Sequence, residues 1–422
     1  MTISYSRSRL VLALVVVVVL AACTSRVSTP SRPATPVAQP TPAAAVAGGP
    51  PATPVDAVRA IVDALRDHAV VALGESHNLA NAGEFYESLV RSDALAAAAD
   101  DVVVEFGNAR YQALVDRYVS GRPVAWSRVR RIWQDTTQVG AWDAPMYARF
   151  FTSIRAANER RPPSHRIRVL LGDPPIDWRG VHTRAETQKY LAGREAFMAR
   201  VIEHEVIAEG EHAVVIAGLA HLERPTAPAP QQNVTQRLDS SDPGSTYVVA
   251  VHLGFPREEW EQRLAAWPVP SIAAIRGTWI GNLPKGEGHA RDALDAVLYL
   301  GPPDSLRLSI PLPSVYRVEG YWRALRHRWG LEGLGPFSAA ALFRDFSGAV
   351  YPGAFSPQGI QATEEFAACM RAHGVGAFPD PQFQYDAVGF YGPGIQRVRH
   401  DPDFAAAQRA CFAEPDEASA PA

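Results

Sequence analysis

The sequence contains little cysteine and little net charge. Three cysteines in 422 residues cannot staple a small disulfide-rich fold, and they exclude a zinc site made of four thiolates. A formal net charge of −3 offers no basic surface, so we expect no nucleic-acid partner. What the chain does contain is 47% hydrophobic residues, enough to bury at least one full core.

The first 23 residues are predicted to be an export leader that lies outside the fold. Arg7 and Arg9 precede an unbroken apolar run, residues 10–20, which is short for a membrane span. The run closes on Leu-Ala-Ala-Cys, which resembles the lipobox of bacterial lipoproteins and implies a lipid on Cys23. The alternative is an ordinary signal peptide or uncleaved anchor with an incidental cysteine. With the lipobox, we expect an extracytoplasmic protein whose lipid anchors it to the bacterial membrane.

Composition divides the rest of the chain. Residues 24–54 contain eight prolines and no acidic residue, so they cannot bury a core and are expected to form a disordered tether. We expect an α/β domain over residues 55–325, a linker over 326–355, and a small helical module over 356–422.

The α/β domain is predicted from apolar runs that alternate with helical patterns. One helical pattern is long and spans residues 183–209. The alternation predicts a mostly parallel sheet with helices on both faces, whose strand carboxyl ends lie along one edge. Strong strands are expected at 68–73, 101–106, 166–171 and 213–217, and weaker ones at 246–252, 271–275 and 296–300.

Ionisable side chains stand at the ends of the strong strands. A Gly-x-x-His motif follows the first of them at residues 74–77, and a second follows the fourth at residues 218–221. Ligand sites of open α/β sheets collect at the edge where the strands end, so we expect the side chains to meet there. The candidates are Glu75, His77, Glu105, Asp173, Asp177 and His221.

Two imidazoles among carboxylates allow two chemistries. His77, His221 and Glu105 can hold a divalent metal with an open position for water. Without a metal, the histidines can act as acid and base, with Glu75, Glu105 or Asp173 orienting them. Both chemistries predict hydrolysis of a small-molecule or peptide ligand at the sheet edge. The structural alternative stands beside them, because a single histidine after a strand is more often a hydrogen-bonded loop residue.

These motifs resemble a known superfamily. The paired Gly-x-x-His motifs and the Val-Val-Val-Glu-Phe strand are similar to erythromycin-esterase-like hydrolases, Tiki and TraB metalloprotease-like proteins, and ChaN-like haem-binding lipoproteins. Residues 194–199, Arg-Glu-Ala-Phe-Met-Ala, look like the Arg-x-x-x-Met-Ala stretch of the ChaN-like branch. Residues 114–121 are similar to the helix that follows the glutamate strand in that branch.

The resemblance implies two different functions. Hydrolase relatives imply catalytic or metal-binding roles for Glu75, His77, Glu105 and His221. ChaN-like relatives imply a haem-binding uptake lipoprotein that uses a tyrosine. A surface scaffold with a degenerate site is a third alternative. The tyrosine candidates are Tyr86, Tyr111 and Tyr118.

A polar and aromatic insertion, residues 133–145, separates the second and third strands. Such a loop is either a lid or specificity wall over the sheet edge, or a surface connection with one buried tryptophan.

The last module carries the two remaining cysteines. With Cys23 assigned to the lipid, export places Cys369 and Cys411 in an oxidising compartment, and we expect a disulfide between them. The Cys-Met-Arg-Ala-His-Gly-Val…Phe-Pro-Asp-Pro…Cys pattern resembles a module of unassigned role in exported bacterial lipoproteins. Met370 and His373 allow a copper or haem role, but Met370 lies one turn from Phe366 and fits a core position more simply.

Overall fold

The computed structural model describes residues 48–334, 337, 357–383, 388–389 and 392–412. The predicted leader with Cys23, most of the tether and most of the linker lie outside the described residues. No helix in the described part is long and apolar enough to cross a membrane.

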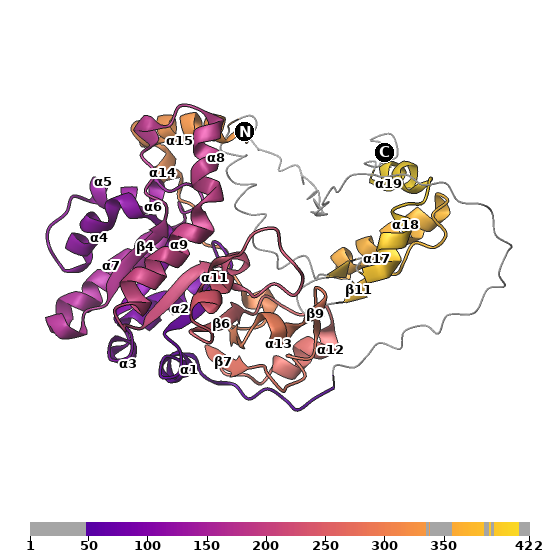
Figure 1. Cartoon of the computed structure of the whole chain (residues 1–422), viewed down its shortest axis with the longest axis horizontal. Coiled ribbons are helices and arrows are strands. Elements are labelled where there is room, and N and C mark those ends of the chain that lie inside the picture. Colours follow the sequence, from indigo (N-terminus) through magenta and orange to yellow (C-terminus); the bar gives the residue numbers. More distant parts are fainter. Residues whose placement is uncertain (1–47, 335–336, 338–356, 384–387, 390–391, 413–422) are drawn as a thin grey trace, which may run out of the picture. The chain divides into compact units, whose positions relative to one another are not determined.

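An eight-stranded sheet forms the centre of the α/β domain, in the order β1-β7-β10-β6-β2-β5-β3-β4 (Figure 1). The strands from β10 to β4 run parallel to one another, whereas β7 is antiparallel to both of its neighbours. The predicted mostly parallel sheet is therefore confirmed, with each expected strand within two residues of its predicted bounds. The strands are β1 Val55–Asp56, β2 Val70–Glu75, β3 Asp101–Asn108, β4 Arg168–Asp173, β5 Ala213–Gly218, β6 Thr246–Val251, β7 Ser271–Ala274 and β10 Ala296–Tyr299.

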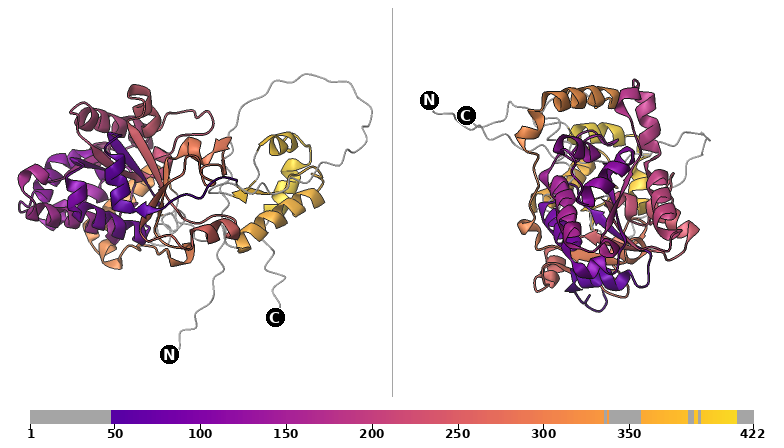
Figure 2. Two further views of the ribbon diagram at one scale, coloured as in Figure 1. Left: turned by 90° about the horizontal axis from the view of Figure 1, so that it is seen from below. Right: turned by 90° about the vertical axis from the view of Figure 1, so that its left-hand side faces the viewer.

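Side-chain alternation along the strands divides the core between two faces of the sheet. On β2, Val71 and Leu73 belong to one core, and Val70 and Ala72 belong to the other. The first face is covered by α1 Ala57–Ala64, α2 Ala80–Arg91, α3 Asp93–Ala96, α4 Gln112–Val119, α5 Trp126–Val129, α6 Arg131–Gln134 and α7 Pro145–Arg160. The second is covered by α9 Arg194–Ile202, α10 Leu219–Leu222, α11 Val234–Ser241, α12 Glu258–Glu261 and α13 Ala290–Ala293. Figure 2 shows helices on both sides of the sheet, as predicted.

The long helical pattern expected over residues 183–209 is helical for most of its length, but it is divided at Gly193. α8, Arg184–Ala192, ends at Gly193, where α9 begins, and a π-helical turn, Glu203–Ile207, follows α9. Glycine has the lowest helix propensity after proline, so it is a natural place for the break. The break makes Arg194 the first residue of α9.

The domain begins earlier than predicted. Residues 48–54, assigned to the tether, lie against the loop before α13. The Asn282 side chain donates to the Gly48 carbonyl at 2.8 Å, and the Trp279 amide donates to the Pro50 carbonyl at 3.0 Å. This loop also precedes a small hairpin of β8, Pro284–Lys285, and β9, Gly288–His289.

The domain also ends later than predicted. α15, Glu319–Glu332, follows the short α14, Pro313–Tyr316, and runs across the expected boundary at residue 325. Its Arg328 is buried and donates to the Asp135 carboxylate at 2.6 Å and to the Gln134 carbonyl at 2.8 Å. Its Tyr321 hydroxyl donates to Asp143 at 2.7 Å. α15 therefore holds both ends of the insertion between β3 and β4.

The C-terminal module has a small core of its own. It consists of α17 Pro357–Ala372, α18 Gly392–Val398, α19 Phe404–Phe412 and a hairpin of β11 Gln382–Phe383 with β12 Val388–Gly389, so it is not purely helical. Met370 is fully buried in this core, which makes it a packing residue. Cys369 and Cys411 form the expected disulfide. Closing a loop with a sequence separation of 42 contributes about 4 kcal/mol in the chain-entropy model.

Candidate functional site

Glu105 is a fully buried carboxylate at the carboxyl end of β3. Its Oε2 accepts a hydrogen bond of 2.6 Å from the Gly218 amide, its Oε1 lies 3.1 Å from His221 Nε2, and the Arg194 guanidinium also donates to Oε1. Burial alone raises the pKa of this carboxyl, but Arg194 and His221 together hold the pKa of Glu105 well below its usual value. Glu105 is therefore a fixed anion, and both of its oxygens accept hydrogen bonds from the protein.

His221 is held between two carboxylates. Its Nε2 faces Glu105, and its Nδ1 pairs with Glu195 from α9. Burial lowers the pKa of this imidazole, but the charge of Glu105 and the hydrogen bonds to Glu105 and Glu195 outweigh burial and raise the pKa of His221 to about 9. Because both ring nitrogens then carry protons at neutral pH, His221 is a fixed cation and not a free base.

Arg194 links Glu105 to Asp173, the residue at the end of β4. Its Nε lies 3.4 Å from Asp173 Oδ1. Its Nη2, the nitrogen that donates to Glu105, also donates to the Gln138 side chain at 2.9 Å. Thr137 donates to Asp173 twice, from its hydroxyl at 2.5 Å and from its amide at 2.7 Å. Burial raises the pKa of Asp173 to about 6, although Arg194 and Thr137 oppose that shift. Asp173 thus contacts Arg194 and Thr137, and of the carboxylates expected as partners of His77, the one beside it is Glu75.

Glu75 and His77 form a second, different pair. The Tyr147 hydroxyl donates to Glu75 Oε1 at 2.8 Å, and Glu75 Oε2 lies 3.6 Å from His77 Nδ1. The His77 ring packs edge-on against Trp142 with centroids 4.7 Å apart. Burial lowers the pKa of His77, but Glu75 and Glu105 more than compensate and raise it above the ordinary value. The His77 side chain is 24% exposed, and a carboxylate lies beside only one of its two ring nitrogens.

The two pairs lie on opposite faces of the sheet. Alternate residues of a strand point to the same face, so Glu75 points to the face of Leu73, in the first core, where it contacts Tyr147. Glu105 points to the face of Val103, in the second core. They meet at Gly218. A Cβ on Gly218 would lie 2.9 Å from His77 Cε1 and 3.3 Å from Glu105 Oε2, so the absence of a side chain there lets His77 approach the other half.

Buried polar atoms without a protein partner gather around the first pair. They include Glu75 Oε2, Ser76 Oγ, His77 Nδ1, both amide atoms of Asn78 and Trp142 Nε1. Asn78 also has a left-handed backbone with φ of 63°, a conformation that occurs preferentially at constrained functional turns. Neither oxygen of Glu105 or Asp173 is in this group. Because buried polar groups are normally hydrogen-bonded, the half with Glu75 and His77 is suited to bind water or a polar ligand.

The residues at the edge do not fit the predicted metal site. The cation that Glu105 faces is the Arg194 guanidinium, and both ring nitrogens of His221 lie against carboxylates, so the two residues pair with protein groups. Within the described ranges, the possible metal ligands whose donor atoms all lie within 4.8 Å of one another are Cys369, His373 and Cys411, which belong to the C-terminal module. We therefore derive no chemistry through a metal held by His77, His221 and Glu105.

The tyrosines expected for haem do not fit either. Tyr86 is 1% exposed, with its hydroxyl buried, and Tyr111 donates its hydroxyl to Asp135 at 2.6 Å. Tyr118 is 7% exposed, and the Arg155 guanidinium lies over its ring at 4.9 Å. None of the three presents a phenolate at the sheet edge.

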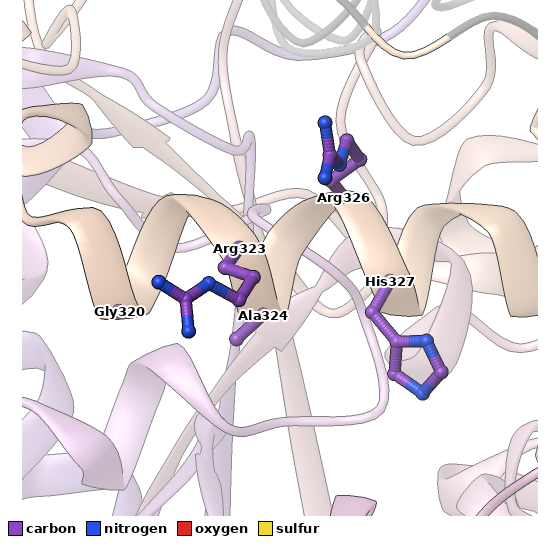
Figure 3. A pocket seen from close by; sticks show the side chains of 5 residues that line it. All are labelled: Gly320, Arg323, Ala324, Arg326 and His327. Carbon is purple, nitrogen blue, oxygen red and sulfur yellow. The ribbon is translucent and has the colours of Figure 1, made fainter.

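Two other features lie apart from this edge. Asp177, expected at the edge, pairs with Arg110 and Arg179, each at 2.8 Å, and these ion pairs lower its pKa to about 2. An open hollow of about 640 Å³ is lined by Gly320, Arg323, Ala324, Arg326 and His327 of α15, none of which belongs to the edge (Figure 3).

Sequence reasoning missed the residues that helices and loops bring to the edge. Arg194, Glu195 and Tyr147 were not among the predicted site residues, although the first two open the stretch that resembles ChaN-like proteins. The insertion supplies Thr137, which donates to Asp173, and Trp142, which packs against His77, and the choice between a wall and a surface connection stays a prediction.

Comparison with known proteins yields likenesses of fold. No protein-family model and no curated protein matches the chain. It is similar to a succinoglycan biosynthesis protein at 10% identity and a TM-score of 0.44, over 59% of this chain and 94% of that one. It is similar to the erythromycin esterase EreC at 11% identity and a TM-score of 0.43, over 60% of this chain and 94% of that one. It is also similar to haem-bound ChaN of Campylobacter jejuni at 11% identity and a TM-score of 0.32, over 57% of this chain and 90% of that one. The fold-level likeness that the motifs predicted is found, and it says nothing of activity or ligand.

Replacing Glu195 by Gln is expected to lower the pKa of His221, because one of the two carboxylates that hold its proton is removed. Because the pKa of His221 is raised in the folded protein, its protonation stabilises the fold fully below about pH 6.5, the ordinary pKa of histidine. That stabilisation is lost as the pH rises through about 9, the pKa in the folded protein. In Glu195→Gln, the stabilisation should be smaller and its loss should be complete at a lower pH. Imidazole nitrogen NMR and denaturation at a series of pH values measure both effects, with exposed Glu209→Gln as the control. An unchanged His221 titration would contradict the assignment.

Gly218→Ala is expected to displace His77, because the added Cβ would lie 2.9 Å from its ring. The cost in stability should be of the overpacking type, about 1–3 kcal/mol, and the His77 ring resonances should shift. Gly180→Ala is the matched control, since nothing lies within 4 Å of a Cβ at that position. Identical His77 resonances in the wild type and Gly218→Ala would show that the two halves do not meet as described.

Proposed function

We propose that the protein is a hydrolase that activates water at the sheet edge without a metal, with His77 as the general base. The observation that supports this proposal is the contrast between the two histidines. His221 is locked as a cation by two carboxylates, whereas His77 has one orienting carboxylate and a partly exposed ring. An acid–base site needs an imidazole that can lose and regain a proton near neutral pH, and His77 is the histidine at the edge that meets this need.

The chain of contacts behind His77 defines the role of each residue. Tyr147 fixes Glu75 through its hydroxyl, and Glu75 favours a proton on His77 Nδ1. The lone pair is then on Nε2, on the ring side that faces Gly218. A water molecule bound there gives its proton to Nε2 as its oxygen attacks a carbonyl carbon.

As the tetrahedral intermediate forms, negative charge develops on the former carbonyl oxygen. Both N–H groups of His221 are taken by carboxylates, so the buried donors without a protein partner near His77, Asn78 Nδ2 and Trp142 Nε1, are the groups available to stabilise it. Collapse of the intermediate breaks the bond to the alcohol or amine, which takes the proton from His77. A carboxylic ester or an amide is thus the substrate class that this arrangement suits. Arg194 and Asp173 keep Glu105 in place and take no part in proton transfer.

His77→Ala is expected to lower kcat about 10²–10⁴-fold, the usual contribution of a general base. Glu75→Gln should retain part of the activity and move the acidic limb of the kcat/KM profile to lower pH, because Glu75 raises the pKa of His77. Hydrolysis of a panel of chromogenic esters and peptide amides, with and without EDTA, measures these effects. His165→Ala, an exposed histidine on another loop, is the control.

The outcomes separate the alternatives. Turnover that survives His77→Ala with the fold intact would remove the assignment of the base. Turnover abolished by EDTA in the wild type would return the metal interpretation. An absorbance band on haem titration with no hydrolysis would favour the haem-binding alternative, and no response in any assay would favour a scaffold with a degenerate site.

We also propose that the protein is exported and anchored to the membrane by a lipid on Cys23, a proposal supported by the lipobox-like sequence. Cys23→Ala is expected to move the protein from the membrane fraction to the soluble fraction and to abolish labelling by a radioactive fatty acid. Labelling that persists in the variant would contradict it.

A further inference from the structure

Three side chains of the C-terminal module converge outside the site described above. Cys369 lies near the end of α17, and Cys411 lies on α19, which packs against α17. His373 follows Cys369 by four residues, and its amide donates to the Cys369 carbonyl at 3.0 Å, so the helical turn places both side chains on one face. A ring nitrogen of His373 and the two sulfurs all lie within 4.8 Å of one another.

We propose that Cys369, His373 and Cys411 form a redox-gated binding site for a thiophilic d¹⁰ metal ion, with Zn²⁺ as the reference ion. While the disulfide is intact, neither sulfur is a thiolate and the site is closed. When the disulfide is reduced, the module presents two thiolates and one imidazole, a ligand set that zinc takes with its fourth position open. This inference does not depend on the proposed hydrolase activity.

The gating reaction balances with a dithiol as reductant. The dithiol gives two electrons and two protons to the Cys369–Cys411 bond, which becomes two thiols, and is itself oxidised to a disulfide. Binding of Zn²⁺ then releases the two thiol protons and forms two zinc–sulfur bonds. No other oxidant or reductant takes part.

The geometry requires only a small movement. Zinc–sulfur bonds of about 2.3 Å at a tetrahedral angle place the two sulfurs roughly 3.8 Å apart, farther than a covalent sulfur–sulfur bond. The two Cα atoms are 5.9 Å apart, and both cysteines are partly exposed, so side-chain rotation can open this gap. His373 is exposed, which gives an ion a path to the site.

The core below the site supports the same conclusion. Met370, Val375 and Ala407, which are close to the three ligands in sequence, are buried in a core against which Phe404 and Cys411 also pack. Met370 is therefore not a fourth ligand. A bound ion would replace the covalent link between α17 and α19, so the module has two closed states, one held by a disulfide and one held by a metal.

The test is titration of the full-length protein with Co²⁺ and Zn²⁺, after reduction by a phosphine and after oxidation. The reduced protein is expected to bind one ion at this site, with the cobalt–thiolate charge-transfer and d–d bands of a tetrahedral sulfur site, and the oxidised protein is expected to show none of these bands. His373→Ala should weaken Zn²⁺ binding by at least about tenfold, because even residues that only orient a ligand contribute that much. If the bands are absent from the Cys369→Ser/Cys411→Ser double variant, they belong to these two sulfurs.

His400→Ala is the matched control, since His400 is an exposed histidine of the same module. The proposal is overturned if the reduced wild-type protein shows no cobalt–thiolate bands, if His373→Ala binds Zn²⁺ as tightly as the wild type, or if the oxidised protein binds equally. Circular dichroism of each reduced sample shows whether α17 and α19 are folded before metal is added, and a gain of helix on adding Zn²⁺ would support the proposal. Hydrolysis assays have no part in this test, so its outcome is separate from that of the proposed hydrolase.

Discussion

The structure of the sheet edge depends on one buried carboxylate, Glu105. An ionised carboxylate in a protein interior is tolerated only when hydrogen bonds and opposite charges replace water around it. Gly218, His221 and Arg194 provide these from β5, α10 and α9, so a single anion fixes how three elements meet β3. Removing the anion would leave two buried cations facing each other. Glu105 therefore sets the position of His221 and, through Gly218, the space into which His77 fits.

The pair of Glu75 with His77 and the pair of Glu105 with His221 differ in chemistry because their glutamates point to opposite faces of the sheet. Glu75 faces the core that contains Tyr147 and Trp142, an aromatic setting with a single strong donor to the carboxylate. Glu105 faces α9, which brings two charged residues at its first turn. Glu75 thus keeps one oxygen without a protein hydrogen bond, whereas both oxygens of Glu105 accept hydrogen bonds. His221 consequently has a carboxylate at each ring nitrogen, whereas His77 has one beside Nδ1.

The sequence could predict the strands and their ionisable ends, because buried parallel strands are short apolar runs and glycines mark where they stop. It could not predict which histidine is free, since that depends on Glu195, which reaches the edge from α9 and is charged like many residues of a solvated helix. Tyr147 likewise appears in the sequence as one aromatic residue of a helical core pattern. The metal prediction left out Arg194 for the same reason: Arg194 places a guanidinium among the carboxylates, and a spacing argument on strand ends does not include helix residues.

α15 fixes the order in which the chain can complete this edge. The insertion that carries Thr137 and Trp142 obtains buried partners for Asp135 and Asp143 from Arg328 and Tyr321. These bonds join residues 193 and 178 positions apart in the chain. During synthesis, the strands of the sheet are all made before α15, the last of them being β10, while Asp135 and Asp143 still lack these partners. The insertion should therefore reach its final position only after residue 328 is available.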